Sequence, residues 1–254
     1  MTVPEGPPPL WRHEHVDSIA STNALALRRA AEGAAHGLWL SASEQTAGRG
    51  RRGRAWSSPR GNLYASVLLR DPASAEATAS LALVCAVAVH EAVARVAGVA
   101  ERLSLKWPND LLLDGGKLAG LLIEARTDGR GTALACGFGV NCRTAPSDTL
   151  YPAATLAAHD VAPADLLRAL MHAFAAELDL WDRGRNLDAV RERWLARARG
   201  LGEPIVVRLP DRELTGTFEA LDGEGRLLLR TGGTLQSIAA GDVFVAPALR
   251  DHIR

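Results

Sequence analysis

The pattern of apolar residues changes near Gly200, and this change constrains the fold more than any other feature of the chain. Before that residue, short runs with strand-like alternation are interspersed with longer runs that have the helical period. After it, the runs are short and β-like, and turn residues such as Asp222-Gly223-Glu224-Gly225 separate them. The sequence therefore predicts an α+β domain over residues 1–200, with residues 1–9 as a flexible tail, and a small β-barrel over residues 201–254.

The expected elements follow from local signals. Ser21 is a typical N-cap for a helix over 23–32, which Gly33 would end. Further helices are expected over 75–96, from Pro163 onward and over 187–199. Strands of the first domain are expected over 38–44, 62–70, 102–107, 111–113, 117–124 and 132–140, and those of the second over 205–209, 214–221 and 226–230.

Composition excludes several classes of protein. Lys plus Arg and Asp plus Glu number 29 each, so the net charge is zero and the whole chain has no electrostatic preference for nucleic acid or anionic lipid. The three cysteines lack CxxC spacing, which argues against a disulfide framework or a zinc site, and no metal ligands are assigned. The N-terminus has prolines instead of a signal-peptide core, and the apolar run over 77–89 leads to His90 and Glu91. We therefore expect a cytoplasmic protein with buried thiols.

A loop rich in glycine and arginine, residues 45–61, is expected between two apolar strands. It has five arginines within thirteen residues and no acid. The GxGxxG pattern at Gly48, Gly50 and Gly53 is not a dinucleotide fingerprint, because a strand and not a helix follows it. Glycines allow close wrapping and arginines attract anions, so a phosphate or carboxylate cradle is favoured. A solvated charged loop and an Arg-Gly segment that binds RNA are the alternatives.

Two further segments carry polar groups at strand ends. Lys106-Trp107-Pro108-Asn109-Asp110, together with Lys117, places two ammonium groups, an amide and a carboxylate around one hairpin. This set could bind a phosphate and a metal, although no P-loop is present. Gly137-Phe138-Gly139-Val140-Asn141 is a strand that ends in an amide, with glycines that permit close backbone approach. Taken singly, each segment also fits an ordinary turn.

In this order and spacing, the segments resemble the biotin protein ligases. The matching residues are Ser21-Thr22-Asn23, Gln45 with GRGRRGR, KWPND with Lys117 and Gly120, and GFGVN. The resemblance extends from about residue 17 through the small β domain. It implies a mixed-sheet catalytic domain of the type shared with class II aminoacyl-tRNA synthetases, followed by an SH3-like domain. It also implies an enzyme that activates biotin with ATP as biotinoyl-5′-AMP and transfers it to a lysine of a biotin carboxyl carrier domain, such as that of acetyl-CoA carboxylase.

The resemblance also assigns roles to individual residues. Catalysis would involve Lys117, Arg54 and Asp110. Biotin would contact Ser21, Thr22, Asn23, Gln45, Gly48, Arg49, Gly50, Arg51, Lys117 and Gly120. ATP would contact Arg54, Trp56, Asn109, Lys117 and Asn141. Several cations are needed, because the biotin carboxylate and the α-phosphate repel each other by roughly 4 kcal/mol at about 4 Å, and Mg2+ is expected as a cofactor that neutralises the remaining phosphates.

The expected partners follow from the same resemblance. Only 20 residues precede Ser21, fewer than a separate DNA-binding domain needs, so the sequence predicts a ligase without repressor function. We expect no nucleic-acid or membrane partner, and a monomer or weak homodimer. A lipoate or octanoate transferase is the alternative of the same fold class, and competition between biotin and octanoate would distinguish the two.

Overall fold

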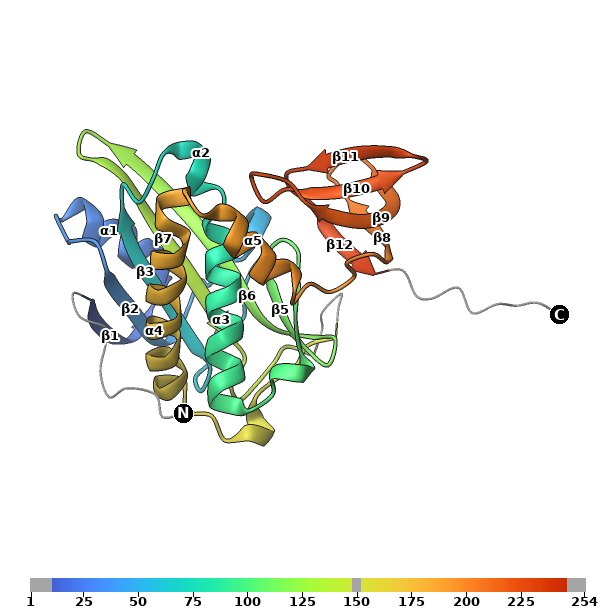
Figure 1. The fold of residues 1–254 in the computed structure, drawn as a ribbon. Helices are drawn as coiled ribbons and strands as arrows, with labels where there is room; N and C mark the ends of the chain where they lie inside the picture. The colour runs from blue at the N-terminus through green and yellow to red at the C-terminus, as the bar shows by residue number, and fades with distance from the viewer. Residues whose placement is uncertain (1–10, 148–151, 246–254) are drawn as a thin grey trace.

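The computed structural model describes residues 11–147 and 152–245, so the flexible tail expected over residues 1–9 lies outside the described residues. A large sheet with helices on both faces makes up most of the molecule, and a smaller sheet lies beside it (Figure 1). The expected combination of a mixed-sheet domain with a small β domain is confirmed.

The large sheet has seven strands, and its first strand was not predicted. The strand order is β1 (Arg12–Ile19), β2 (Leu38–Gln45), β3 (Leu63–Arg70), β7 (Gly131–Val140), β6 (Gly116–Asp128), β5 (Asp110–Leu113) and β4 (Leu103–Lys106). Strands β1 and β2 are parallel and all other neighbours are antiparallel. Strand β1 is an edge strand whose residues are mostly exposed and polar. Because these residues are exposed, the strand has no alternating apolar pattern that sequence analysis could detect. Backbone pairing with β2 holds it in place.

Two helices cover one face of this sheet, and a third packs against both of them. They are α3 (Leu81–Ala97), α4 (Pro163–Trp181) and α5 (Leu187–Leu195), and they enclose the main core with aromatic rings such as those of Trp39 and Phe174. Residues 75–97 are apolar and long enough to cross a bilayer by composition, but 67% of their most apolar window is buried inside the protein. The apolar part of this segment, α3, is therefore a helix of the protein core.

Two of the predicted helices are shorter than expected. The helix predicted over 75–96 is divided near Ser80 into α2 (Ala75–Thr78) and α3. The Ser80 hydroxyl donates to the carbonyl of Ala77 and accepts from Trp181 Nε1 at 2.8 Å, so tertiary contacts stabilise the break. The helix predicted over 187–199 ends at Leu195 in the structure. The residues that follow leave the helix and hydrogen-bond to Leu105 in the edge strand β4.

The opposite face of the sheet is covered only in part. Helix α1 (Thr22–Ala31) packs there on a small cluster that includes Leu40, Leu68 and Ala135. The Ser21 hydroxyl caps this helix by accepting from Ala24 N, as predicted. Beyond the N-terminus of α1, no helix in the described part of the chain covers this face, and a cavity lies there.

The small sheet has five antiparallel strands, of which the sequence predicted three. The order is β11 (Thr234–Ile238), β10 (Leu227–Thr231), β9 (Glu213–Leu221), β8 (Pro204–Arg208) and β12 (Asp242–Val245). Strands β11 and β12, at the two edges, were not predicted. Strand β11 is mostly exposed and is defined by pairing, whereas β12 is a short apolar run that the sequence analysis did not identify. The buried residues of the small sheet, including Ile205, Val207 and Phe218, belong to the same apolar cluster as the main core.

All three cysteines are free and buried, as expected. Burial raises the pKa of the Cys142 thiol to about 11 and raises the pKa of Cys85 above its ordinary value. Both thiols therefore stay protonated near neutral pH and do not provide nucleophiles.

Candidate functional site

A cavity of about 310 Å3 lies on the partly covered face of the large sheet. Its floor is formed by β6 and β7, and its walls are the start of α1, the glycine–arginine loop, the 106–110 segment and residues of β12. Every site residue predicted from the sequence lines this cavity except Gly48. A Cβ at Gly48 would lie 2.5 Å from both Ser58 Oγ and Trp56 O, so this glycine shapes the loop from within.

Three glycines make the floor low enough for other side chains to lie on it. A Cβ at Gly139 would be 2.6 Å from Trp56 Nε1, and one at Gly120 would be 3.0 Å from the same ring. A Cβ at Gly137 would be 2.4 Å from Asn23 Oδ1. These glycines are therefore required by close approach and not by a turn.

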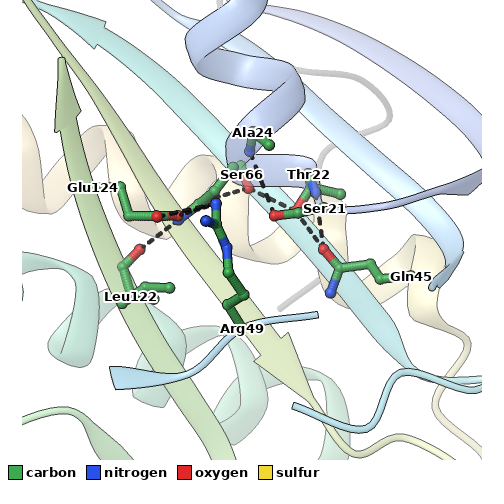
Figure 2. Close-up of polar contacts among 9 residues, drawn as sticks. Ser21, Thr22, Ala24, Gln45, Arg49, Ser66, Leu122 and Glu124 are labelled. Atoms are coloured by element: carbon green, nitrogen blue, oxygen red, sulfur yellow. Dashed lines mark hydrogen bonds and ion pairs between the residues drawn. The ribbon is translucent and has the colours of Figure 1, made fainter. Parts of the chain in front are cut away.

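Neutral hydroxyl and amide groups form one part of the wall. Gln45 Oε1 accepts from Thr22 N at 2.9 Å and from Thr22 Oγ1 at 3.2 Å (Figure 2). Gln45 Nε2 donates to Ser58 Oγ. Helix α1 places Ser21 and Thr22 here because its N-terminus points at the cavity. This part offers both donors and acceptors to a neutral polar ligand.

Charged groups form a second part of the wall, around Asp110. Lys106 Nζ lies 3.1 Å from Asp110 Oδ2, and Lys117 Nζ lies 2.6 Å from Oδ1. The antiparallel pairing of β4, β5 and β6 brings these three residues together, since Lys106 pairs with Asp110 and Asp110 pairs with Gly120. Two ammonium groups against one carboxylate leave a positive excess, which favours an anionic ligand.

The loop arginines are held by partners on different parts of the chain. Arg51 donates to Asn109 Oδ1 at 3.3 Å, and its burial lowers the pKa of the guanidinium, which nevertheless stays charged. Arg52 and Arg54 pair with Asp242 of β12 at 3.4 and 2.9 Å. Sequence analysis missed Asp242, because about 190 residues separate it from the loop and no motif surrounds it.

Asn141 fixes the backbone around Lys117. Its Nδ2 donates to the carbonyls of Lys117 at 3.3 Å and Ala154 at 3.1 Å. Asn141 was predicted to contact ATP, and it lines the cavity while it also holds the strand that carries Lys117.

A preformed metal site is not present among the described residues. Within residues 11–147 and 152–245, no group of three His, Cys, Asp or Glu side chains is placed to hold a metal ion. Both carboxylate oxygens of Asp110 face ammonium groups, which compete with a divalent cation for them. The side chains therefore do not fit a dedicated Mg2+ site.

Known protein families match both parts of the chain. Residues 16–141 match the model of the Biotin/lipoate A/B protein ligase family, and residues 200–245 match the Biotin protein ligase C terminal domain. A biotin–[acetyl-CoA-carboxylase] ligase of Paracoccus denitrificans is 43% identical over 236 residues, which are 88% of this chain and 96% of that protein.

Solved structures show the same similarity. A biotin protein ligase of Aquifex aeolicus in complex with biotin and ATP has a TM-score of 0.78 and 27% identity, and the match covers 92% of this chain and 97% of that one. The biotin protein ligase of Leishmania major in complex with biotinyl-5-AMP has a TM-score of 0.64 and 27% identity, with 91% and 100% covered.

Proposed function

Because this chain belongs to the biotin protein ligase family, we propose that its cavity binds biotin and ATP side by side and that the residues predicted from the sequence act there. The enzyme activates biotin as biotinyl-5′-AMP and then transfers it to a lysine of a carrier protein. One observation carries the assignment of the site. A single cavity combines a neutral hydrogen-bonding wall with a cationic wall, as a ligand with a ureido head and a reacting carboxylate requires.

The neutral wall is assigned to the head of biotin. Ser21, Thr22 and Gln45 present hydroxyl and amide groups that can both donate to and accept from a ureido group. Asn23, Arg49, Gly50, Arg51 and Gly120 complete this assignment.

The cationic wall is assigned to the first chemical step. A carboxylate oxygen of biotin attacks the α-phosphorus of ATP, the bond to the β-phosphate breaks, and pyrophosphate leaves. Lys117 stabilises the negative charge that develops on the reacting oxygens, and its ion pair with Asp110 supports this role because it holds the ammonium in position. Arg54, Trp56, Asn109 and Asn141 are assigned to the nucleotide.

The second step needs orientation and a dry site. The neutral amine of the carrier lysine attacks the activated carbonyl carbon, and AMP leaves with the electron pair of the mixed anhydride. An amide forms as the nitrogen releases one proton to solvent. A loop closed over the adenylate excludes water, which would otherwise hydrolyse it.

The proposed function also implies a cofactor, a partner protein and a location. We expect Mg2+ to arrive bound to ATP, held by phosphates and water, since the side chains form no dedicated site. The carrier is expected to be the biotin carboxyl carrier domain of acetyl-CoA carboxylase or a related enzyme. The protein is proposed to act in the cytoplasm as a monomer or weak homodimer. Its two domains are proposed to meet at residue 200.

The test is biotin-dependent exchange of labelled pyrophosphate into ATP without a carrier protein. Exchange with biotin, and none with octanoate or lipoate, is the expected result. Exchange with a fatty acid and not with biotin would assign the chain to the lipoate branch of the matched family, and no exchange with any of the three would contradict the proposed chemistry.

A further inference from the structure

Glu124 lies beside the cavity although no sequence motif includes it. On β6 it continues the row of Gly120 and Leu122, both of which line the cavity, because alternate residues of a strand face the same side. It pairs across the sheet with Ala135, against which α1 packs. Its side chain is therefore placed where the cavity meets the N-terminal part of α1.

The Glu124 carboxylate joins two residues that are expected to contact biotin. Asn23 Nδ2 donates to Oε2 at 2.9 Å. The Arg49 guanidinium lies 3.1 Å from Oε1 (Figure 2). Asn23 belongs to α1, whereas Arg49 belongs to the glycine–arginine loop. One carboxylate thus connects the loop to the rigid sheet and to a helix.

Asn23 is fixed from several sides. Its Oδ1 accepts from Ser66 Oγ at 2.7 Å, and its Nδ2 also donates to the carbonyl of Leu122 at 3.1 Å. Its side chain is buried above Gly137, where a Cβ would collide with it. By contrast, the Arg49 side chain is 48% exposed. Glu124 is therefore the anchored partner, and Arg49 is the partner that loop opening would carry away.

The loop is attached to the protein at two sides of the cavity. On one side, Arg51 contacts Asn109 and Arg54 pairs with Asp242. On the other side, Arg49 pairs with Glu124. Opening of the α1 side of the cavity requires the separation of this charge-assisted pair.

We propose that Glu124 is a positioning residue that fastens the glycine–arginine loop over bound biotin and sets how long biotin and biotinyl-5′-AMP stay bound. The inference rests on the proposed function. In this role Glu124 does not contact the reacting atoms. Removal of its carboxylate therefore affects binding and release of the ligand more than the chemical step.

The test is Glu124→Gln, which keeps the size and an acceptor for Asn23 but removes the charge that holds Arg49. Labelled biotinyl-5′-AMP is formed on the enzyme and chased with unlabelled biotin and ATP. We expect release about tenfold faster and a similar rise in the KM for biotin, with a smaller change in the kcat of pyrophosphate exchange. Glu219→Gln removes a carboxylate from an exposed pair with Arg230 and is the control, with release as in the wild type.

A double-mutant cycle with Arg49→Gln identifies the route of the effect. If Glu124 acts through Arg49, adding Glu124→Gln to Arg49→Gln accelerates release by less than about twofold. An undiminished effect in that background, or unchanged release in Glu124→Gln itself, would overturn the proposal. If Glu124→Gln fails to fold in a melting experiment, Glu124→Asp replaces it, and its shorter reach is expected to accelerate release about threefold. A wild-type enzyme without biotin-dependent exchange would instead refute the proposed function.

Discussion

The ammonium of Lys117 is held between a carboxylate and an indole ring. Its Nζ lies 2.6 Å from Asp110 Oδ1 and 5.4 Å from the centre of the Trp56 ring. Asn141 and Pro152 fix the backbone on either side of it through hydrogen bonds. The charge is therefore positioned before a ligand enters, which is what electrostatic stabilisation of a transition state requires.

We predict that Lys117→Arg does not preserve activity. The guanidinium is planar and larger than the ammonium, so it cannot occupy the same point between Asp110 and Trp56. The rate of biotin-dependent pyrophosphate exchange should fall about a hundredfold or more in both Lys117→Arg and Lys117→Ala. Near wild-type turnover of the arginine variant would show that only the charge matters.

The glycines of the cavity floor leave no room for a side chain. In Gly137→Ala, the new methyl group would lie 2.4 Å from Asn23 Oδ1, and Asn23 cannot move without losing its bonds to Ser66 and Glu124. We expect a loss of about 1–3 kcal/mol in the free energy of unfolding, measured with urea, together with weaker biotin binding. Gly129→Ala is the control, since no atom lies within 4 Å of its added Cβ. Equal stability of the two variants would contradict the packing argument.

Helix α3 carries a buried histidine in the main core. His90 is 6% exposed, and burial, together with the positive charge of Arg197, lowers its pKa to about 4. Other charged groups near it include Glu91, which has the opposite effect on the pKa. The imidazole is therefore neutral in the folded protein at pH 7 and binds a proton more readily in the unfolded chain.

This difference predicts acid sensitivity of the fold. The stabilising contribution of neutral His90 is fully present above pH 6.5 and is lost as the pH falls toward 4, because only the unfolded state takes up the proton in that range. Urea unfolding should show a loss of about 2 kcal/mol between pH 7 and pH 5 from this residue. In His90→Gln this part of the pH dependence should disappear. An unchanged slope in the variant would place the acid sensitivity elsewhere.

At the scale of the whole molecule, the small sheet closes one side of the cavity. Asp242 of β12 pairs with Arg52 and Arg54, and Trp107 Nε1 donates to the carbonyl of Gly225 at 3.2 Å. These three contacts connect the small sheet to the loop and to the 106–110 segment. The position of the C-terminal unit thus affects the part of the cavity that we propose for the nucleotide.

We predict that Asp242→Asn impairs ATP binding although the residue lies outside the large sheet. Without the carboxylate, Arg52 and Arg54 lose the partner that orients them, and the KM for ATP in the exchange reaction should rise about threefold to tenfold. Glu213→Gln, which removes a carboxylate from an exposed pair with Arg208 in the same small sheet, is the control. A lower KM for ATP in Asp242→Asn would show that the carboxylate only neutralises the arginines.

Most residues that line the cavity were predicted from the sequence. Groups such as Lys106 to Asp110 are adjacent in the chain, so their spacing is visible without a fold. The amphipathic helices and central strands were also predictable, because burial of one face imposes a period on the apolar residues.

Tertiary structure alone decided the features that depend on distant partners. Strands β1 and β11 are mostly exposed and exist through backbone pairing, which leaves no alternating apolar pattern. The break at Ser80 depends on Trp181, about 100 residues away. Glu124 and Asp242 join the site only because sheet pairing and packing of the small sheet bring them to the loop arginines. A single carboxylate outside any motif has no periodicity or spacing to reveal it, so only its position in space shows which cation it holds.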